Sequence, residues 1–162
     1  MTSEPMDIVL RKATPEDEPF LLAVYASTRM EELAGLGWDE NQKQLFLRMQ
    51  FLARERSFAR GDHRIVLLDE HPVGRLLVGR NGPAIQLIDI AFLPEYRNAG
   101  IGTRLIEDLK QEATAAGKPI VLHVLALSPA VRLYERLGFR RSDAGSAYEE
   151  AYLEMKWVPA TS

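Results

Sequence analysis

The 162-residue chain contains no cysteine. This absence excludes disulfides, thiolate nucleophiles, cysteine zinc sites and iron–sulfur clusters together. Long apolar runs are missing too, because the longest, such as residues 20–26, fall far short of the roughly 20 residues that span a bilayer. Residues 1–7 offer neither a basic segment nor an apolar one, so no secretory signal is visible. We therefore expect a cytoplasmic protein without a membrane partner.

An excess of positive charge is also lacking. The 20 basic and 23 acidic side chains leave a formal net charge of −3. Proteins that neutralise long nucleic acids need a broad basic surface, so no nucleic-acid partner is expected. The net charge does not exclude a small anionic ligand bound at a local site. The sequence has no His-Glu-x-x-His motif and no carboxylates at calcium spacing, so no metal is expected.

What is present predicts one domain over residues 1–162, because a chain of this length can bury roughly 70% of its unfolded surface. Helical periodicity predicts two helices between residues 14 and 61, the first capped by Thr14 and the second by Asp39. Further helices are expected at 100–116 and 129–137. Strands are expected at 8–12, 64–68, 73–78, 84–92, 120–124, 139–141 and 152–157. This order predicts an α+β or mixed α/β fold, a sheet with helices on both faces.

The segment from Phe92 to Arg104 carries the clearest chemical signal. It joins a strand that looks buried to a helix, and Gly100 and Gly102 leave the helix start free of side chains. The first N–H groups of a helix lack intrahelical partners, and the helix dipole adds partial positive charge. Together they form an anion site suited to a diphosphate, to which Arg97, Thr103 and Arg104 could contribute.

Glycines at a strand-to-helix turn also occur in other nucleotide-binding sites. A dinucleotide-binding fingerprint needs a third glycine where Leu105 stands, and an acidic residue after the next strand, which residues 117–124 lack. A phosphate loop needs Gly-Lys-Ser/Thr, which the chain does not contain. Tight packing of strand against helix is the purely structural alternative.

A second motif follows the next strand and favours a binding site over purely structural packing. Residues 97–102, RNAGIG, resemble the R/Q-x-x-G-x-G/A signature of the GNAT superfamily of acetyl-CoA-dependent N-acetyltransferases. Residues 130–139, AVRLYERLGF, are similar to the second signature of that family. The resemblance is close over residues 87–139 and looser elsewhere. It implies a transferase that moves an acetyl group from acetyl-CoA to a primary amine.

The resemblance also implies where acetyl-CoA binds. In this family a mostly antiparallel sheet has central parallel strands that splay, and acyl-CoA lies in the gap. The main chain of Ile90, Ala91 and Phe92 would contact the pantetheine and acetyl group, and one N–H would polarise the thioester carbonyl. These three residues could equally belong to the ordinary core of the strand, and this is compatible with the role because only main-chain groups are used. Together with Arg97, the pyrophosphate would be held by Asn98, Ala99, Gly100, Ile101, Gly102 and Thr103.

Tyr134 aligns with the family tyrosine that hydrogen-bonds the CoA sulfur and protonates the leaving thiolate. A phenol of pKa about 10 can donate a proton to such a group without being ionised at neutral pH. A core tyrosine on an amphipathic helix is the alternative. Ser128 stands where many relatives carry Asn. Serine can cap the following helix, with Pro129 at its first position, but it reaches less far toward the cofactor.

A base must accept the proton of the amine, which costs roughly 4–5 kcal/mol to remove at pH 7. His63 and His71 fall in or near turns and are expected in solvent. His123 lies in a strand where family members often place a catalytic Glu, so it is either a general base or a satisfied core residue.

Asp89 is the second candidate and should have a partner, because burying an unpaired carboxylate is costly. Strand alternation places it on the face of Ile85 and Leu87. We hypothesise that His123 and Asp89 face one cleft, one as base and the other as orienter or amine anchor. A water chain is a further route for the proton.

The acceptor pocket is expected near the break between the first two helices. There Glu31 and Glu32 accompany Trp38, and acidic groups beside an aromatic ring suit a cationic amine. Surface charge with Trp38 in the core is the alternative. The acceptor would be a small molecule or a peptide amine, and family members are often dimers, so a homodimer is an expectation.

The absence of cysteine excludes an acyl-cysteine relay, so the amine is expected to attack acetyl-CoA directly in a ternary complex. An acyl-CoA-binding sensor or regulatory domain that has lost catalysis is the alternative from another class.

Overall fold

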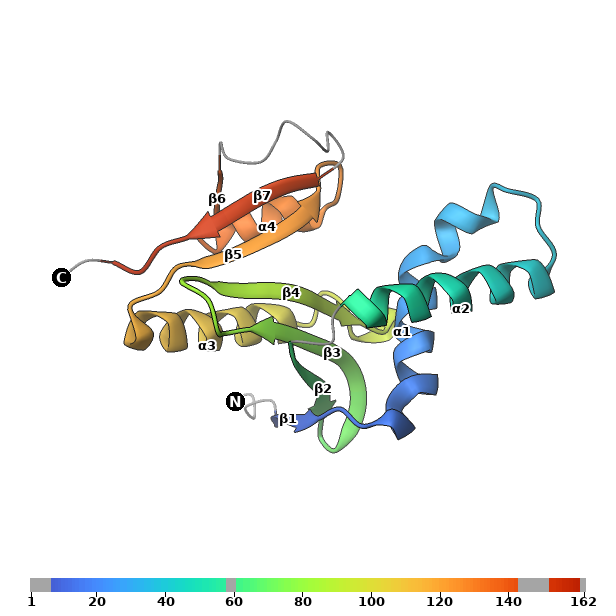
Figure 1. Ribbon diagram of the computed structural model, residues 1–162, viewed down its shortest axis with the longest axis horizontal. Helices are drawn as coiled ribbons and strands as arrows, with labels where there is room; N and C mark the ends of the chain where they lie inside the picture. The colour runs from blue at the N-terminus through green and yellow to red at the C-terminus, as the bar shows by residue number, and fades with distance from the viewer. Residues whose placement is uncertain (1–6, 58–60, 143–151, 161–162) are drawn as a thin grey trace, which may run out of the picture. The chain divides into compact units, whose positions relative to one another are not determined.

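The computed structural model describes residues 7–57, 61–142 and 152–160 (Figure 1). These residues form seven strands, four α-helices and two 3-10 turns, in the following order: β1 (Ile8–Lys12), η1 (Pro15–Asp17), α1 (Glu18–Ala34), α2 (Glu40–Ser57), β2 (Asp62–Leu68), β3 (His71–Gly79), β4 (Ile85–Phe92), η2 (Pro94–Tyr96), α3 (Ile101–Ala116), β5 (Ile120–Leu125), α4 (Ala130–Arg136), β6 (Arg140–Arg141) and β7 (Tyr152–Trp157).

The strands form one sheet in the order β1-β2-β3-β4-β5-β7-β6. β1 pairs with β2, and β5 with β7, in antiparallel fashion, whereas β4 and β5 are parallel. The prediction of a mixed, mostly antiparallel sheet with a central parallel pair is therefore confirmed. The parallel register covers only Ile85 to Leu87 on β4 and Ile120 to Leu122 on β5, although both strands continue beyond it.

This short register corrects one expectation. The apolar run of β4 predicts a strand buried along its length. Only Ile85 and Leu87 are buried, and from Ile88 onward every residue is half-buried. The change from buried to half-buried residues thus falls where the pairing with β5 ends, and the splay of the parallel pair stays a prediction.

Local signals set several boundaries, although Thr14 precedes the 3-10 turn η1 and α1 begins only after Asp17. Asp17 accepts the Thr14 N–H at 2.8 Å and binds Arg11 at 2.9 Å, so the chain turns firmly from β1 into α1. Asp39 accepts the N–H of Gln42 at 2.8 Å and caps α2 as expected. α3 ends at Gly117, whose φ of +67° suits a residue without a Cβ.

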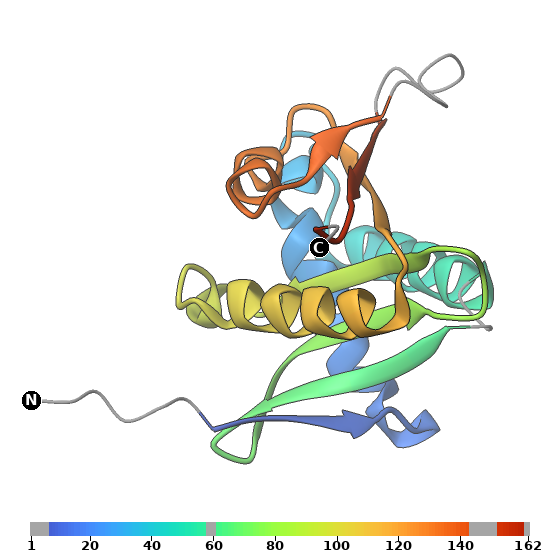
Figure 2. The same cartoon turned by 90° about the vertical axis from the view of Figure 1, so that its left-hand side faces the viewer.

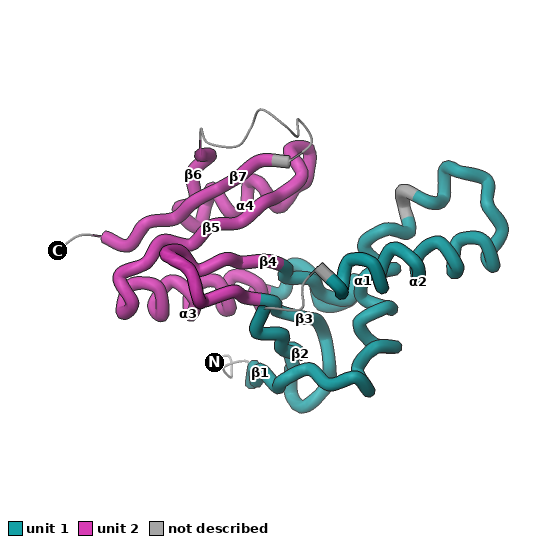
Figure 3. Tube along the Cα trace, in the orientation of Figure 1, with its two compact units in different colours: residues 1–77, 89–99 teal, residues 78–88, 100–162 magenta. Residues whose placement is uncertain are grey.

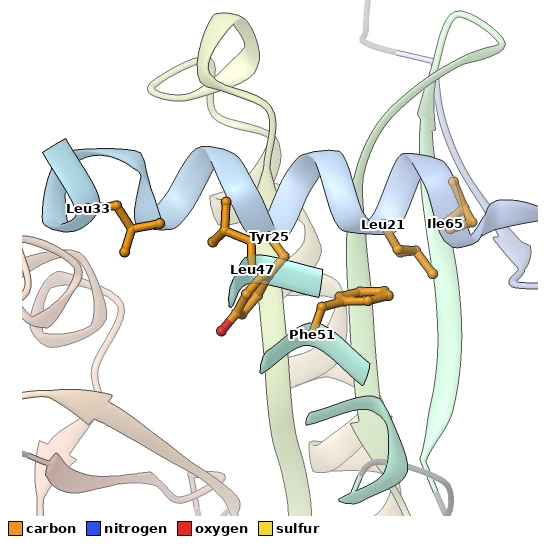
Figure 4. Packing of buried hydrophobic residues seen from close by; sticks show 6 residues of the cluster. All are labelled: Leu21, Tyr25, Leu33, Leu47, Phe51 and Ile65. Atoms are coloured by element: carbon orange, nitrogen blue, oxygen red, sulfur yellow. The ribbon is translucent and has the colours of Figure 1, made fainter. Parts of the chain in front are cut away.

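The chain divides into two compact units (Figure 3), Met1–Leu77 with Asp89–Ala99 and Val78–Ile88 with Gly100–Ser162. The core of the first unit joins three elements through side chains at most 4% exposed. Figure 4 shows them: Leu21, Tyr25 and Leu33 of α1, Leu47 and Phe51 of α2, and Ile65 of β2.

In the second unit, α4 packs beside β5, and β5 pairs with β7, as two views of the ribbon agree (Figures 1 and 2). The buried side of α3 carries apolar residues at helical spacing. They are Ile101, Leu105, Ile106, Leu109 and Ala113.

Candidate active site

Two contacts define how β3 and β4 pair. A side chain at Gly79 would lie 3.6 Å from the Cβ of Gln86, so these residues are opposite one another. Further along, the N–H of Leu93 donates to the carbonyl of Val73 over 2.9 Å. Between these two points β4 contains one residue more than β3. The extra residue is a β-bulge, a feature that re-aims backbone and side chains beside functional sites.

Asp89 lies in this bulged stretch. Its Oδ1 is 3.3 Å from Arg54 Nη2, and its Oδ2 is 3.3 Å from Arg75 Nε. The expectation that the carboxylate has a partner is confirmed. Because Arg75 shares the β3 face of Gly79, Asp89 lies on that face and not, as alternation predicts, on the face of Ile85. The bulge reverses the alternation, so this part of the prediction was wrong.

Sequence reasoning missed Arg75. Its side chain is 2% exposed, and its Nη1 also donates to Glu55 Oε1 at 2.6 Å. The signal was one basic residue inside β3, where every position from Val73 to Val78 is buried. A buried charge requires a charged partner, so this residue marks a buried ion pair, although the sequence does not indicate which carboxylates form it.

The loop between β4 and α3 has the backbone of an anion site. Asn98 and Gly100 have positive φ values of 61° and 83°, and α3 begins at Ile101. The first N–H bonded back into the helix belongs to Arg104, which donates to the Gly100 carbonyl at 3.0 Å. Among the described residues, the N–H groups of residues 98–103 donate to no protein acceptor. Backbone N–H groups without a protein acceptor are what an anion site at a helix start requires.

The guanidinium of Arg97 is hydrogen-bonded within the protein. Its Nε donates to the Phe92 carbonyl and its Nη2 to Ser27 Oγ, both at 3.2 Å. These bonds tie the start of the loop to the end of β4 and to α1. Contact of Arg97 with a phosphate stays a prediction.

On the second unit, Tyr134 lies on α4 with 8% of the residue exposed, and its ring meets Phe139 edge-on at 5.8 Å. Ser128 caps this helix, because its Oγ accepts the N–H of Ala130 at 3.1 Å. The capping role predicted for Ser128 is confirmed. Its contact with a cofactor, and the acid role of Tyr134, stay predictions.

His123 projects from β5 with 59% of its side chain exposed, so it is not a core histidine. Its Nε2 lies 3.5 Å from Oε1 of Glu154, the residue directly opposite it on β7. Each of the two candidate bases thus has a partner within its own unit: His123 has Glu154, and Asp89 has two arginines.

His63 is a second correction. It lies in β2 and not in a solvated turn, and its Nε2 is buried. Burial, followed by the nearby charge of Arg75, lowers the pKa of His63 below 6.5. It borders a pocket of about 220 Å³ in the first unit that contains none of the residues predicted for acyl transfer. The pocket is lined by Ala13, Thr14, Pro15, Glu18, Leu21, Phe51, Leu52, Glu55 and His63.

Of the three residues predicted to bind the acceptor amine, the structure describes the side chain of one, Trp38. Trp38 is half-buried against the core of the first unit and meets Phe46 edge-on at 5.2 Å. Glu31 and Glu32 belong to α1, but their side chains lie outside the described part of the chain. Within that part, no helix is long and apolar enough to cross a membrane. The described residues also contain no cluster of three or more His, Asp or Glu side chains that could hold a metal ion.

A bulged strand, a loop with left-handed residues and a helix whose first N–H groups lack protein acceptors together have the backbone that an anion site at a strand-to-helix turn requires. A profile described as "Acetyltransferase (GNAT) family" matches residues 23–139. The chain belongs to the GNAT acetyltransferase family, and this membership supports acyl-CoA-dependent acetyl transfer.

Individual relatives agree with this assignment. Over 70 residues, 41% of its length, the chain is 39% identical to the Cysteine-rich protein 2-binding protein of Mus musculus and of Homo sapiens. The match covers 9% of those proteins, so the chain spans about a tenth of the curated relatives it matches.

Solved structures share the fold at lower identity. The PaiA N-acetyltransferase of Thermoplasma acidophilum, in complex with coenzyme A, has a TM-score of 0.69 at 20% identity, over 94% of this chain and 99% of that one. The ribosomal-protein-S18-alanine N-acetyltransferase of Escherichia coli has a TM-score of 0.60 at 18% identity, over 96% of each chain.

Proposed function

We propose that this protein transfers an acetyl group from acetyl-CoA to a primary amine by direct attack in a ternary complex. The observation that carries the proposal is the run of open N–H groups at residues 98–103, placed between β4 and α3. Hydrogen bonds to charged groups are worth roughly 1.5–3 kcal/mol each, so a few amides suffice to hold a diphosphate. A net charge of −3 is therefore no obstacle.

Acetyl-CoA supplies the acetyl group as a thioester. The main chain of Ile90, Ala91 and Phe92 binds the pantetheine arm, and one N–H in this stretch donates to the carbonyl oxygen on which negative charge develops. These residues are only half-buried, and the register of β4 with β5 ends before them. Their backbone groups are thus free of the parallel ladder, as such a role requires.

Two protons move in the reaction. The amine nitrogen bonds to the thioester carbon and gives up a proton, the carbon–sulfur bond breaks, and the departing sulfur takes a proton from the Tyr134 hydroxyl. Packing on Phe139 fixes the Tyr134 ring, which favours one hydroxyl position. The tyrosine is restored to neutrality from solvent.

We assign the base to His123, directly or through water. Its imidazole is exposed and lies 3.5 Å from a single carboxylate, that of Glu154, whereas Asp89 is already held by Arg54 and Arg75. Asp89 therefore suits an orienting role better than that of a proton acceptor.

The acceptor is a small-molecule or peptide amine, and Glu31, Glu32 and Trp38 are the residues we propose for its recognition. A homodimer is the proposed assembly. The test is a screen of amines, including polyamines, aminoglycosides, amino acids and peptides, that follows release of the CoA thiol against a control without amine. Amine-dependent release supports the transferase. Tight binding of acetyl-CoA without release on any amine would favour the sensor.

A further inference from the structure

Four charged side chains connect α2, β3 and β4 in the first unit. Arg75 contacts Glu55 at 2.6 Å and Asp89 at 3.3 Å, and Asp89 also contacts Arg54 at 3.3 Å. Arg54 in turn lies 5.6 Å from the centre of the Tyr25 ring. The two positive and two negative charges balance, and Arg75 is 2% exposed at the centre. A buried guanidinium that holds two carboxylates in fixed directions constrains the backbone on either side of it.

The neighbouring residue of β3 shows the same close fit. A side chain at Gly74 would collide with the carbonyl oxygen of Ala91 and would lie 2.5 Å from Cδ1 of Phe92. The backbone of β3 therefore presses directly on β4 just after Asp89. Gly74 and Arg75 thus fix consecutive parts of the bulge by two independent means, close contact and charge.

We propose that Arg75 is a positioning residue for acyl transfer. Through Asp89 it holds the bulged backbone of residues 90–92 in the conformation that presents an N–H to the acyl group. This inference rests on the proposed function of these residues. Arg75 is assigned no contact with acyl donor or amine, because its side chain is 2% exposed and its Nη1 and Nε face Glu55 and Asp89 inside the first unit.

The charge network offers its own matched control. Glu55 and Asp89 both bind Arg75, and their side chains are 24% and 14% exposed. Only Asp89 is directly bonded in the chain to the acyl-binding residues 90–92, whereas Glu55 lies on α2. Loss of either carboxylate should weaken the fold to a similar degree, but only loss of Asp89 should misplace residues 90–92.

The experiment compares Arg75→Lys, Asp89→Asn and Glu55→Gln with the wild type. Thermal unfolding, acetyl-CoA affinity by calorimetry, kcat, KM for the amine, and the pH profile of kcat/KM are measured for each. Arg75→Lys keeps the charge but loses the planar fork that reaches both carboxylates. We expect Arg75→Lys and Asp89→Asn to weaken acetyl-CoA binding at least fivefold and to lower kcat at least tenfold. The midpoints of the pH profile and KM for the amine should stay unchanged, and Glu55→Gln should keep kcat and affinity within twofold.

Equal losses in all three variants, in step with their thermal stability, would overturn the inference and leave a merely structural network. Loss of the acid limb of the pH profile in Asp89→Asn alone would also overturn it, because Asp89 would then be the base. If the wild type binds acetyl-CoA but releases no CoA on any amine, the transferase proposal fails, and the binding comparison still tests Arg75. If Asp89→Asn does not fold, Arg75→Lys carries the test.

Discussion

Replacement of Tyr134 by Phe separates a catalytic hydroxyl from a packed ring. Tyr134 is 8% exposed and its ring rests on Phe139, so Phe keeps the packing and removes one oxygen. Removal of the hydroxyl should lower the free energy of unfolding by no more than about 0.5–1.5 kcal/mol, the net contribution of one hydrogen bond. A general acid contributes roughly 10²–10⁴ in rate, which corresponds to about 2.7–5.5 kcal/mol of barrier. We therefore expect kcat to fall about 100-fold, while acetyl-CoA affinity changes less than threefold.

The assay for Tyr134→Phe is steady-state CoA release with saturating amine, together with calorimetric titration of acetyl-CoA. Tyr25→Phe is the matched control, because Tyr25 is 4% exposed and loses the same atom from the core of α1 and α2. The control should lose a similar amount of stability and keep kcat within twofold. If Tyr134→Phe also keeps the wild-type kcat, the tyrosine is a core residue and the thiolate takes its proton from elsewhere.

Three further predictions concern stability and are measured by urea unfolding. Asp17→Asn should lower the free energy of unfolding at pH 7 by about 1 kcal/mol, given partial screening of Arg11 by solvent. The Arg11 guanidinium, followed by the Thr14 N–H, lowers the pKa of Asp17 from 3.8 to about 2. The difference in free energy of unfolding between the wild type and Asp17→Asn should thus vanish as the pH falls from about 4 toward 2. A difference that persists at about pH 2 would contradict this assignment. Burial lowers the pKa of His63, so the unfolded chain binds a proton first and the wild type should lose stability below pH 6.5. His63→Gln should reduce the dependence of the free energy of unfolding on pH in this range. An unchanged pH dependence would mean that another group causes it. Ser128→Ala should cost about 1 kcal/mol by removing the bond to the Ala130 N–H, whereas Ser128→Asn, which can also cap, should cost little. Equal losses in both variants would mean that the cap is unimportant.

The sequence predicted the elements well where local chemistry decides them. Thr14 with Asp17, Asp39 with Gln42, and the glycine at position 117 each provide hydrogen-bond partners or backbone freedom at a boundary, and each boundary lies within a few residues of the expected position. The turn from β4 to α3 was predicted for the same reason, because its glycines act on their own backbone.

Features that depend on two strands at once were not predictable in this way. Strand alternation placed Asp89 on the wrong face, because one extra residue in β4 relative to β3 leaves no periodic trace in a single sequence. His63 looked like a turn residue, yet β2 begins before it. Arg75 was visible as a lone charge in an apolar strand, but its partners come from α2 and β4, far away in the chain.

The measurement that tests the account most directly is a calorimetric titration of acetyl-CoA into the wild type, Gly102→Glu and Gly82→Glu. Gly102 lies in the first turn of α3, among the open N–H groups, whereas Gly82 lies in a turn with space around it. A carboxylate about 6 Å from one phosphate charge costs about 2.8 kcal/mol at an effective dielectric of about 20, or roughly 100-fold in affinity. The account predicts that the wild type and Gly82→Glu bind acetyl-CoA alike and that Gly102→Glu binds at least 100-fold more weakly. Equal affinity in Gly102→Glu would contradict the assignment of the diphosphate to the start of α3.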